Sequence, residues 1–139
     1  MLAAALAAAP AARSADSACV RFSDGWARLP AAEGMAMTAG FGQLHNRCKA
    51  EIAVTSVRSE AFKDVSLHET TLGEDGVSRM REVGQLPLPA GQGAELAPGG
   101  LHLMLMHAHA PLQEGQRLPL LLGLSDGTEV RTELVVRQP

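Results

Sequence analysis

The residues whose side chains most clearly indicate a chemical function lie in the segment LHLMLM at positions 101–106. Side chains alternate between the two faces of a β-strand, so a strand here would present three leucines on one face. His102, Met104 and Met106 would share the other face. The leucine face is typical of a hydrophobic core, whereas the other face carries an imidazole and two thioethers, which are ligands for a soft metal ion.

A second histidine and another methionine stand upstream of this segment. Apolar and polar residues alternate over positions 61–70, which predicts a strand with His68 on its polar face. The sequence EDG at 74–76 is typical of a hairpin turn, and Met80 follows it on the returning strand. Cross-strand pairing can bring the two side chains close together.

The types of these four residues indicate which ion they would bind. Thioether sulfur is soft and neutral and favours copper(I) over hard ions such as magnesium, while imidazole suits zinc, copper, iron or nickel. A set without thiolates also avoids oxidation in an exported compartment. We therefore expect His68, Met80, His102 and Met104 to bind one copper(I) ion.

The spacing of these residues resembles that of the PCuAC family of periplasmic copper(I) chaperones. The family places twenty-one residues between a Met and a His-x-Met motif, as Met80, His102 and Met104 do here. The flanking sequences DGVSRMR and PGGLHLMLM are also similar, and the resemblance extends over residues 19–137. It implies a periplasmic protein that passes copper(I) to a copper-accepting partner, such as a cytochrome oxidase subunit or its assembly factor.

The chain departs from the family pattern at one point. The family has ten residues between the first His and the Met, whereas His68 and Met80 enclose eleven. An extra residue within a strand would turn every later side chain to the opposite face, but in a turn it only lengthens the loop. We therefore place it in the turn at 73–76 and keep both His68 and Met80 as ligands.

The remaining histidines and methionines are weaker candidates. We expect Met106 to sit deeper on the ligand face and to pack. Met35 and Met37 alternate on a Gly-flanked segment and would belong either to the core or to a soft outer patch. His107 and His109 form a His-x-His pair that could take up copper(II) weakly, although a solvated loop is the more typical interpretation.

Short alternating segments closed by turn residues must position these ligands. They predict an all-β fold, a cupredoxin-like antiparallel β-sandwich or Greek-key barrel, as one domain over residues 19–139. Residues 87–100, rich in Pro and Gly, are predicted to be mostly loop. The predicted strands are residues 20–29, 35–45, 51–58, 61–70, 77–83, 101–107, 117–124 and 129–137.

Composition restricts the possible functions. Hydrophobic residues make up 46% of the 139 residues but aromatics only 3%, so the core must consist of Leu, Val, Ala and Met around a few rings. The net charge of -3 lacks the basic excess that nucleic-acid binding requires. No arrangement of Ser, His and Asp or of paired carboxylates indicates catalysis, so we do not expect an enzyme.

The Ala-rich residues 1–18 are interpreted as a signal-like or disordered leader, too short for stable membrane insertion. In an exported chain, two cysteines without a Cys-x-x-Cys spacing favour a disulfide, here between Cys19 and Cys48. Two unpaired buried thiols are the alternative. Asp16 disfavours a lipid anchor on Cys19, and His45, near Cys48, is interpreted as structural.

Three functions remain open on the sequence alone. The first is a copper(I) chaperone. The second is an electron-transfer copper protein, which would need a Cys thiolate beside two histidines. The third is a metal-free β-sandwich interaction domain in which the Met and His face is part of the core.

Overall fold

The computed structural model describes residues 16, 19–32 and 34–138. These residues form ten β-strands and the segments that connect them. The predicted leader lies outside these residues except for Asp16, whose carboxylate contacts Arg131 at 3.1 Å. The strands are β1 (Val20–Arg28), β2 (Met37–Asn46), β3 (Ile52–Arg58), β4 (Phe62–Leu72), β5 (Ser78–Glu82), β6 (Leu86–Leu88), β7 (Gly93–Leu96), β8 (Leu101–Ala108), β9 (Arg117–Leu124) and β10 (Glu129–Arg137).

The all-β prediction is confirmed, and two short strands were not foreseen. Both lie in or at the edge of the segment predicted to be mostly loop: β6 pairs with β3, and β7 pairs with β2. Strand β6 is the last strand of the sheet, where Pro87 is tolerated because an edge strand need not donate on both sides. Three or four residues are too few to show an alternating pattern in the sequence.

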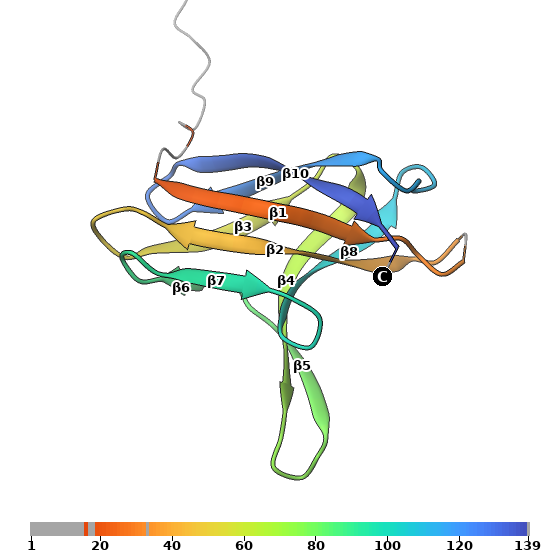
Figure 1. Ribbon diagram of the computed structural model, residues 1–139, viewed down its shortest axis with the longest axis horizontal. Helices are drawn as coiled ribbons and strands as arrows, with labels where there is room; N and C mark the ends of the chain where they lie inside the picture. The colour runs from red at the N-terminus through yellow and green to blue at the C-terminus, as the bar shows by residue number, and fades with distance from the viewer. Residues whose placement is uncertain (1–15, 17–18, 33, 139) are drawn as a thin grey trace, which may run out of the picture.

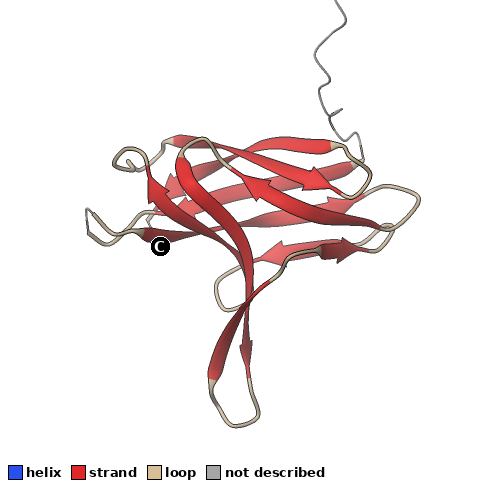
Figure 2. Ribbon diagram, turned by 180° about the vertical axis from the view of Figure 1, so that it is seen from behind, coloured by secondary structure: helices blue, strands red, loops and turns tan. Residues whose placement is uncertain are grey.

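The strands form one curled sheet in the order β5-β4-β8-β7-β2-β1-β10-β9-β3-β6, with an additional pairing of β8 and β2. Strands β3 and β9 lie behind β1 and β2 in Figure 1 and come forward in Figure 2, so the sheet closes on itself as two layers. The prediction of a purely antiparallel sheet was wrong in one respect, because β1 with β10 and β7 with β8 pair in parallel.

Leucine and valine dominate the core between the two layers. Leu103, Leu105 and Leu134 are each at most 1% exposed. The expectation that methionine would help to fill the core was wrong, since no methionine is buried among the described residues. Phe41 is buried but outside the main core, where it contacts Trp26 with ring centroids 4.7 Å apart.

The hairpin of β4 and β5 projects from the body of the molecule as an arm (Figures 1 and 2). Every residue of β5 is exposed, so the arm is held by its pairing with β4 and by its turn. In the turn, Asp75 accepts hydrogen bonds from Arg79 and from the backbone N–H of Val77. Both bonds lower the pKa of the Asp75 carboxyl, the bond from Arg79 more than the bond from Val77. The two bonds therefore weaken only when the pH falls through that lowered pKa.

Cys19 and Cys48 form the predicted disulfide, with their Cα atoms 5.0 Å apart. It joins the start of β1 to the segment that follows β2. Both cysteines of the chain are therefore oxidised, and the Cys19 thiol is not available for a lipid. Across the described residues we find no apolar helix of membrane-spanning length.

Replacing both cysteines by serine should lower the free energy of unfolding by about 3 to 4 kcal/mol, because the bridge closes a loop of 29 residues in the unfolded chain. Chemical denaturation of the oxidised protein and of the variant measures this difference. Two reactive thiols in unreduced, denatured wild-type protein would contradict the assignment.

Candidate metal centre

The pairing of β4 with β8 places two of the predicted ligands directly opposite each other. His68 is the cross-strand partner of His102, and their ring centroids lie 6.0 Å apart with planes inclined by 21°. Ser66 pairs with Met104 two residues further along. Because cross-strand partners share a face, both imidazoles and the Met104 thioether lie on one side of the sheet.

Met80 reaches the same face from the arm. It is the partner of Thr70, which stands two residues from His68 on β4, so Met80 is a diagonal neighbour of His68. The pairing is regular from His68 opposite Glu82 to Leu72 opposite Ser78. The turn at 73–77 therefore accommodates the extra residue without reversing the face on which Met80 lies.

An open groove of about 580 Å³ joins three of the four predicted ligands. Met80, His102 and Met104 line it, and Met80 is 52% exposed. His68 is half-buried beside His102 but does not line the groove. Its Nε2 lies 2.8 Å from the hydroxyl of Ser66, which holds the ring on the ligand face.

A backbone contact fixes the chemical form of His102. Its Nδ1 lies 3.0 Å from the carbonyl oxygen of Gly100, which can only accept a hydrogen bond. In the neutral ring the proton therefore lies on Nδ1, and Nε2 is the nitrogen that carries the lone pair. This arrangement, in which one ring nitrogen donates to a carbonyl and the other is left for a metal ion, is typical of histidine ligands.

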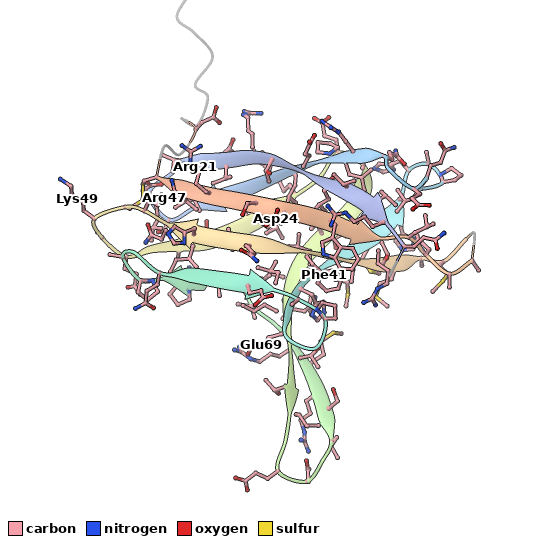
Figure 3. All side chains as sticks on the ribbon, viewed as in Figure 1. Arg21, Asp24, Phe41, Arg47, Lys49 and Glu69 are labelled. Carbon is pink, nitrogen blue, oxygen red and sulfur yellow. A yellow bond between two sulfur atoms is a disulfide. The ribbon has the colours of Figure 1, made fainter. Side chains whose placement is uncertain are left out.

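Charged groups lie around the candidate ligands. Glu82 is exposed directly opposite His68 and on the same face. Arg28 also lines the groove, and its guanidinium lies 5.3 Å from the centroid of the Phe41 ring. Glu69, labelled in Figure 3 where the arm leaves the body, forms a 3.0 Å ion pair with Arg81 on the other face.

Two further methionines border the groove. The sequence alone could not decide whether they belong to the core or to an outer patch. Met35 and Met37 line the groove, with 53% and 47% of their surfaces exposed. The alternation of these two residues was the available signal, but it could not tell an outward face from an inward one. Met106 pairs with Met37 and is half-buried, and it does not line the groove.

In the described part of the chain, the other histidines do not gather with Cys, Asp or Glu side chains into a metal site. His45, His107 and His109 are all exposed. No group of three or more His, Cys, Asp or Glu side chains gathers anywhere in the described residues. The donors that accompany the facing imidazoles of His68 and His102 are thioethers.

The fold and this donor set describe a β-sandwich with a candidate soft-donor site on one sheet face. The chain belongs to the LpqE-like family, whose description reads "Putative lipoprotein LpqE-like" and whose model matches residues 20–136. A curated relative from Leifsonia xyli subsp. xyli, "Putative lipoprotein Lxx21020", is 38% identical over 110 residues, or 78% of this chain. The aligned part spans 64% of that relative's own length.

Solved structures with the same fold include copper-binding domains. The apo PCuAC domain of PmoF1 has a TM-score of 0.74 at 24% identity and aligns with 91% of this chain and all of its own. The copper-bound PCuAC domain of PmoF2 gives 0.71 at 21% identity, covering 86% of this chain and 93% of its own. Copper(I)-bound DR1885 of Deinococcus radiodurans gives 0.64 at 22% identity, covering 88% and 82%.

These likenesses confirm the cupredoxin-like fold of PCuAC proteins that the sequence predicted. The three neighbours are named as PCuAC domains or as a copper(I)-bound protein, and none of the three is named as an enzyme. The family match and the disulfide are both typical of an exported protein.

The hydrogen bond to Gly100 predicts one tautomer for His102. In the metal-free protein, nitrogen-15 NMR of the neutral His102 ring should show the proton on Nδ1 rather than on Nε2. A bare Nδ1 would contradict the geometry described here.

Proposed function

We propose that the chain is a periplasmic copper(I) carrier that binds one ion through His68, Met80, His102 and Met104 and transfers it to a partner protein. The observation that carries this proposal is the register of β4 and β8, which sets two imidazoles face to face with a thioether beside them. The groove lined by Met80, His102 and Met104 adds the second thioether from the arm.

The donor set fits copper(I) and no common hard ion. Two neutral imidazoles and two thioethers offer soft nitrogen and sulfur without any negative charge, which suits a monovalent soft cation. The ion keeps its full positive charge in such a site, and Glu82 on the same face can balance part of it. The known copper(I) form of DR1885 supports the choice of ion, since that protein shares the fold.

The arm suggests how the ion could leave. Met104 is half-buried in the body of the sheet, whereas Met80 is 52% exposed on a strand that has only one neighbour. Met80 can therefore move away at a smaller cost in buried surface than Met104 can. A soft donor of the partner would take the position that Met80 vacates, and the two imidazoles would hold the ion during the exchange.

The partner is a copper-accepting protein of the same compartment. We propose a cytochrome oxidase subunit or the factor that assembles its copper site, as the resemblance to PCuAC proteins implies. The disulfide and the lipoprotein-like family support an exported location, and the periplasm is the compartment that we propose.

The alternative functions make different demands on the chain. An electron-transfer copper protein needs a free thiolate, and both cysteines of this chain stand in the disulfide. A metal-free interaction domain would be favoured if the core contained the methionines, but the methionines of the described residues lie outside it. Copper(I) binding by the isolated chain separates the carrier from this last alternative.

Replacing Met104 by Leu should weaken copper(I) binding roughly tenfold or more, equivalent to about 1.4 kcal/mol. The change preserves volume and should cost less than about 1.5 kcal/mol of stability. Met80→Leu and His102→Ala should weaken binding in the same direction. Anaerobic competition against a copper(I) chelator measures each affinity.

Met106→Leu is the matched control, because Met106 lies on the same strand and face and is also half-buried. It should bind copper(I) with nearly wild-type affinity. If Met104→Leu keeps wild-type affinity and Met106→Leu loses it, the ligand assignment is wrong. If no replacement matters, the site itself is wrong.

Copper(I) affinity should fall as the pH is lowered, because protons compete with the metal ion for the imidazoles of His68 and His102. Replacing both histidines by glutamine should remove most of this dependence and leave weak binding by the thioethers. Chelator competition at a series of pH values measures the slope. An affinity that does not change with pH would show that no imidazole binds the ion.

A further inference from the structure

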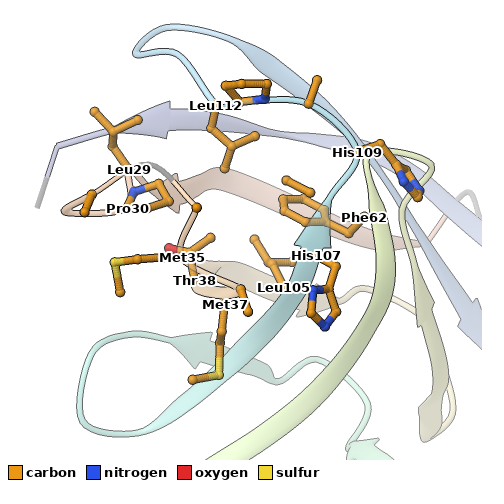
Figure 4. A pocket seen from close by; sticks show the side chains of 16 residues that line it. Leu29, Pro30, Met35, Met37, Thr38, Phe62, Leu105, His107, His109 and Leu112 are labelled. Atoms are coloured by element: carbon orange, nitrogen blue, oxygen red, sulfur yellow. The ribbon is translucent and has the colours of Figure 1, made fainter.

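All the methionines of the described residues lie outside the core, and Met35, Met37 and Met106 have no part in the four-ligand site. Met35 and Met37 are about half exposed, so neither is packed in the way that a methionine filling a gap would be. Both line the groove of the proposed copper site. Both also line a second cavity of about 490 Å³ next to it (Figure 4).

A third soft donor enters this second cavity because the backbone of β8 turns. The alternation of the strand would place His107 with Leu103 and Leu105 on the core face. Instead His107 has a φ of 52°, in the left-handed region that histidine adopts only at a cost, and its side chain is exposed. Its backbone N–H is bonded to the carbonyl oxygen of Ala36, between the two methionines, at 2.7 Å.

Two thioethers and an imidazole therefore line this one cavity. Figure 4 shows Met37 and His107 on neighbouring strands, with His109 apart from them beyond Phe62. The three donors come from β2, the residues before it, and β8. This is a soft, neutral donor set like that of the first site, and it would select the same kind of ion.

We propose that Met35, Met37 and His107 form a second, weaker copper(I) site that adjoins the first. The role of this second site rests on the proposed function, because a copper carrier benefits from a weaker site between its tight site and its partner. Met35 and Met37 line both cavities and so connect the two sites. An ion that leaves His102 and Met104 can bind sulfur before it reaches solvent.

The second site is weaker for a physical reason. It has one imidazole where the first has two. Both of its methionines are about half exposed and must give up side-chain freedom on binding, whereas in the first site only Met80 is that exposed. Copper(I) should therefore fill the sites in order.

The experiment uses protein labelled with carbon-13 at the methionine methyl groups and titrated anaerobically with copper(I). The first equivalent should shift the methyl signals of Met80 and Met104. The second should shift those of Met35 and Met37, while Met106 changes least. His107→Gln should weaken the second step about tenfold, and His109→Gln is the matched control that should leave it unchanged.

The outcomes separate the two proposals. If only Met80 and Met104 respond up to two equivalents, the first site stands and the second is overturned. If Met35 and Met37 shift together with Met104 at a single equivalent, there is one larger site and the second is again overturned. In a His102→Gln, Met104→Leu variant, a response of Met35 and Met37 to the first equivalent supports the second site even if the first were wrong.

Discussion

The register between β4 and β8 is the constraint on which the candidate site depends. The same ladder that sets His68 opposite His102 also sets Leu67 opposite Leu103 and Val65 opposite Leu105. The leucines and valine are buried in the core, and each buried side chain of this size stabilises the fold by about 1.5 to 3 kcal/mol. A slip of one residue would expose them and bury the imidazoles, so core burial fixes the ligands in place.

The two halves of the site differ in how firmly the fold holds them, and this difference suits a carrier. His102 and Met104 share their strand with buried leucines, and the Gly100 carbonyl orients the His102 ring. Met80 belongs to β5, whose residues are all exposed and which, among the described strands, lies at the edge of the sheet beside β4. A donor set with three anchored members and one on an arm can bind an ion and still admit a partner's ligand.

The sequence could predict the parts of the structure that strict alternation encodes. Strand β8 and the hairpin of β4 and β5 follow from residue alternation and turn chemistry, and the disulfide follows from the two cysteines of an exported chain. Strands β6 and β7 are too short to alternate, and the parallel pairing of β1 with β10 joins segments from the two ends of the domain. The outward position of Met37 depends on which face the neighbouring strands cover, and the turn of His107 depends on a backbone φ that no residue type requires.

The central claim is that one ion contacts both imidazoles and thioethers on this face. X-ray absorption at the copper edge of the protein loaded anaerobically with one equivalent of copper(I) tests it most directly. The account predicts a first shell that contains both nitrogen and sulfur, with sulfur reduced in Met104→Leu. A shell of nitrogen and oxygen alone, unchanged by that replacement, would contradict it.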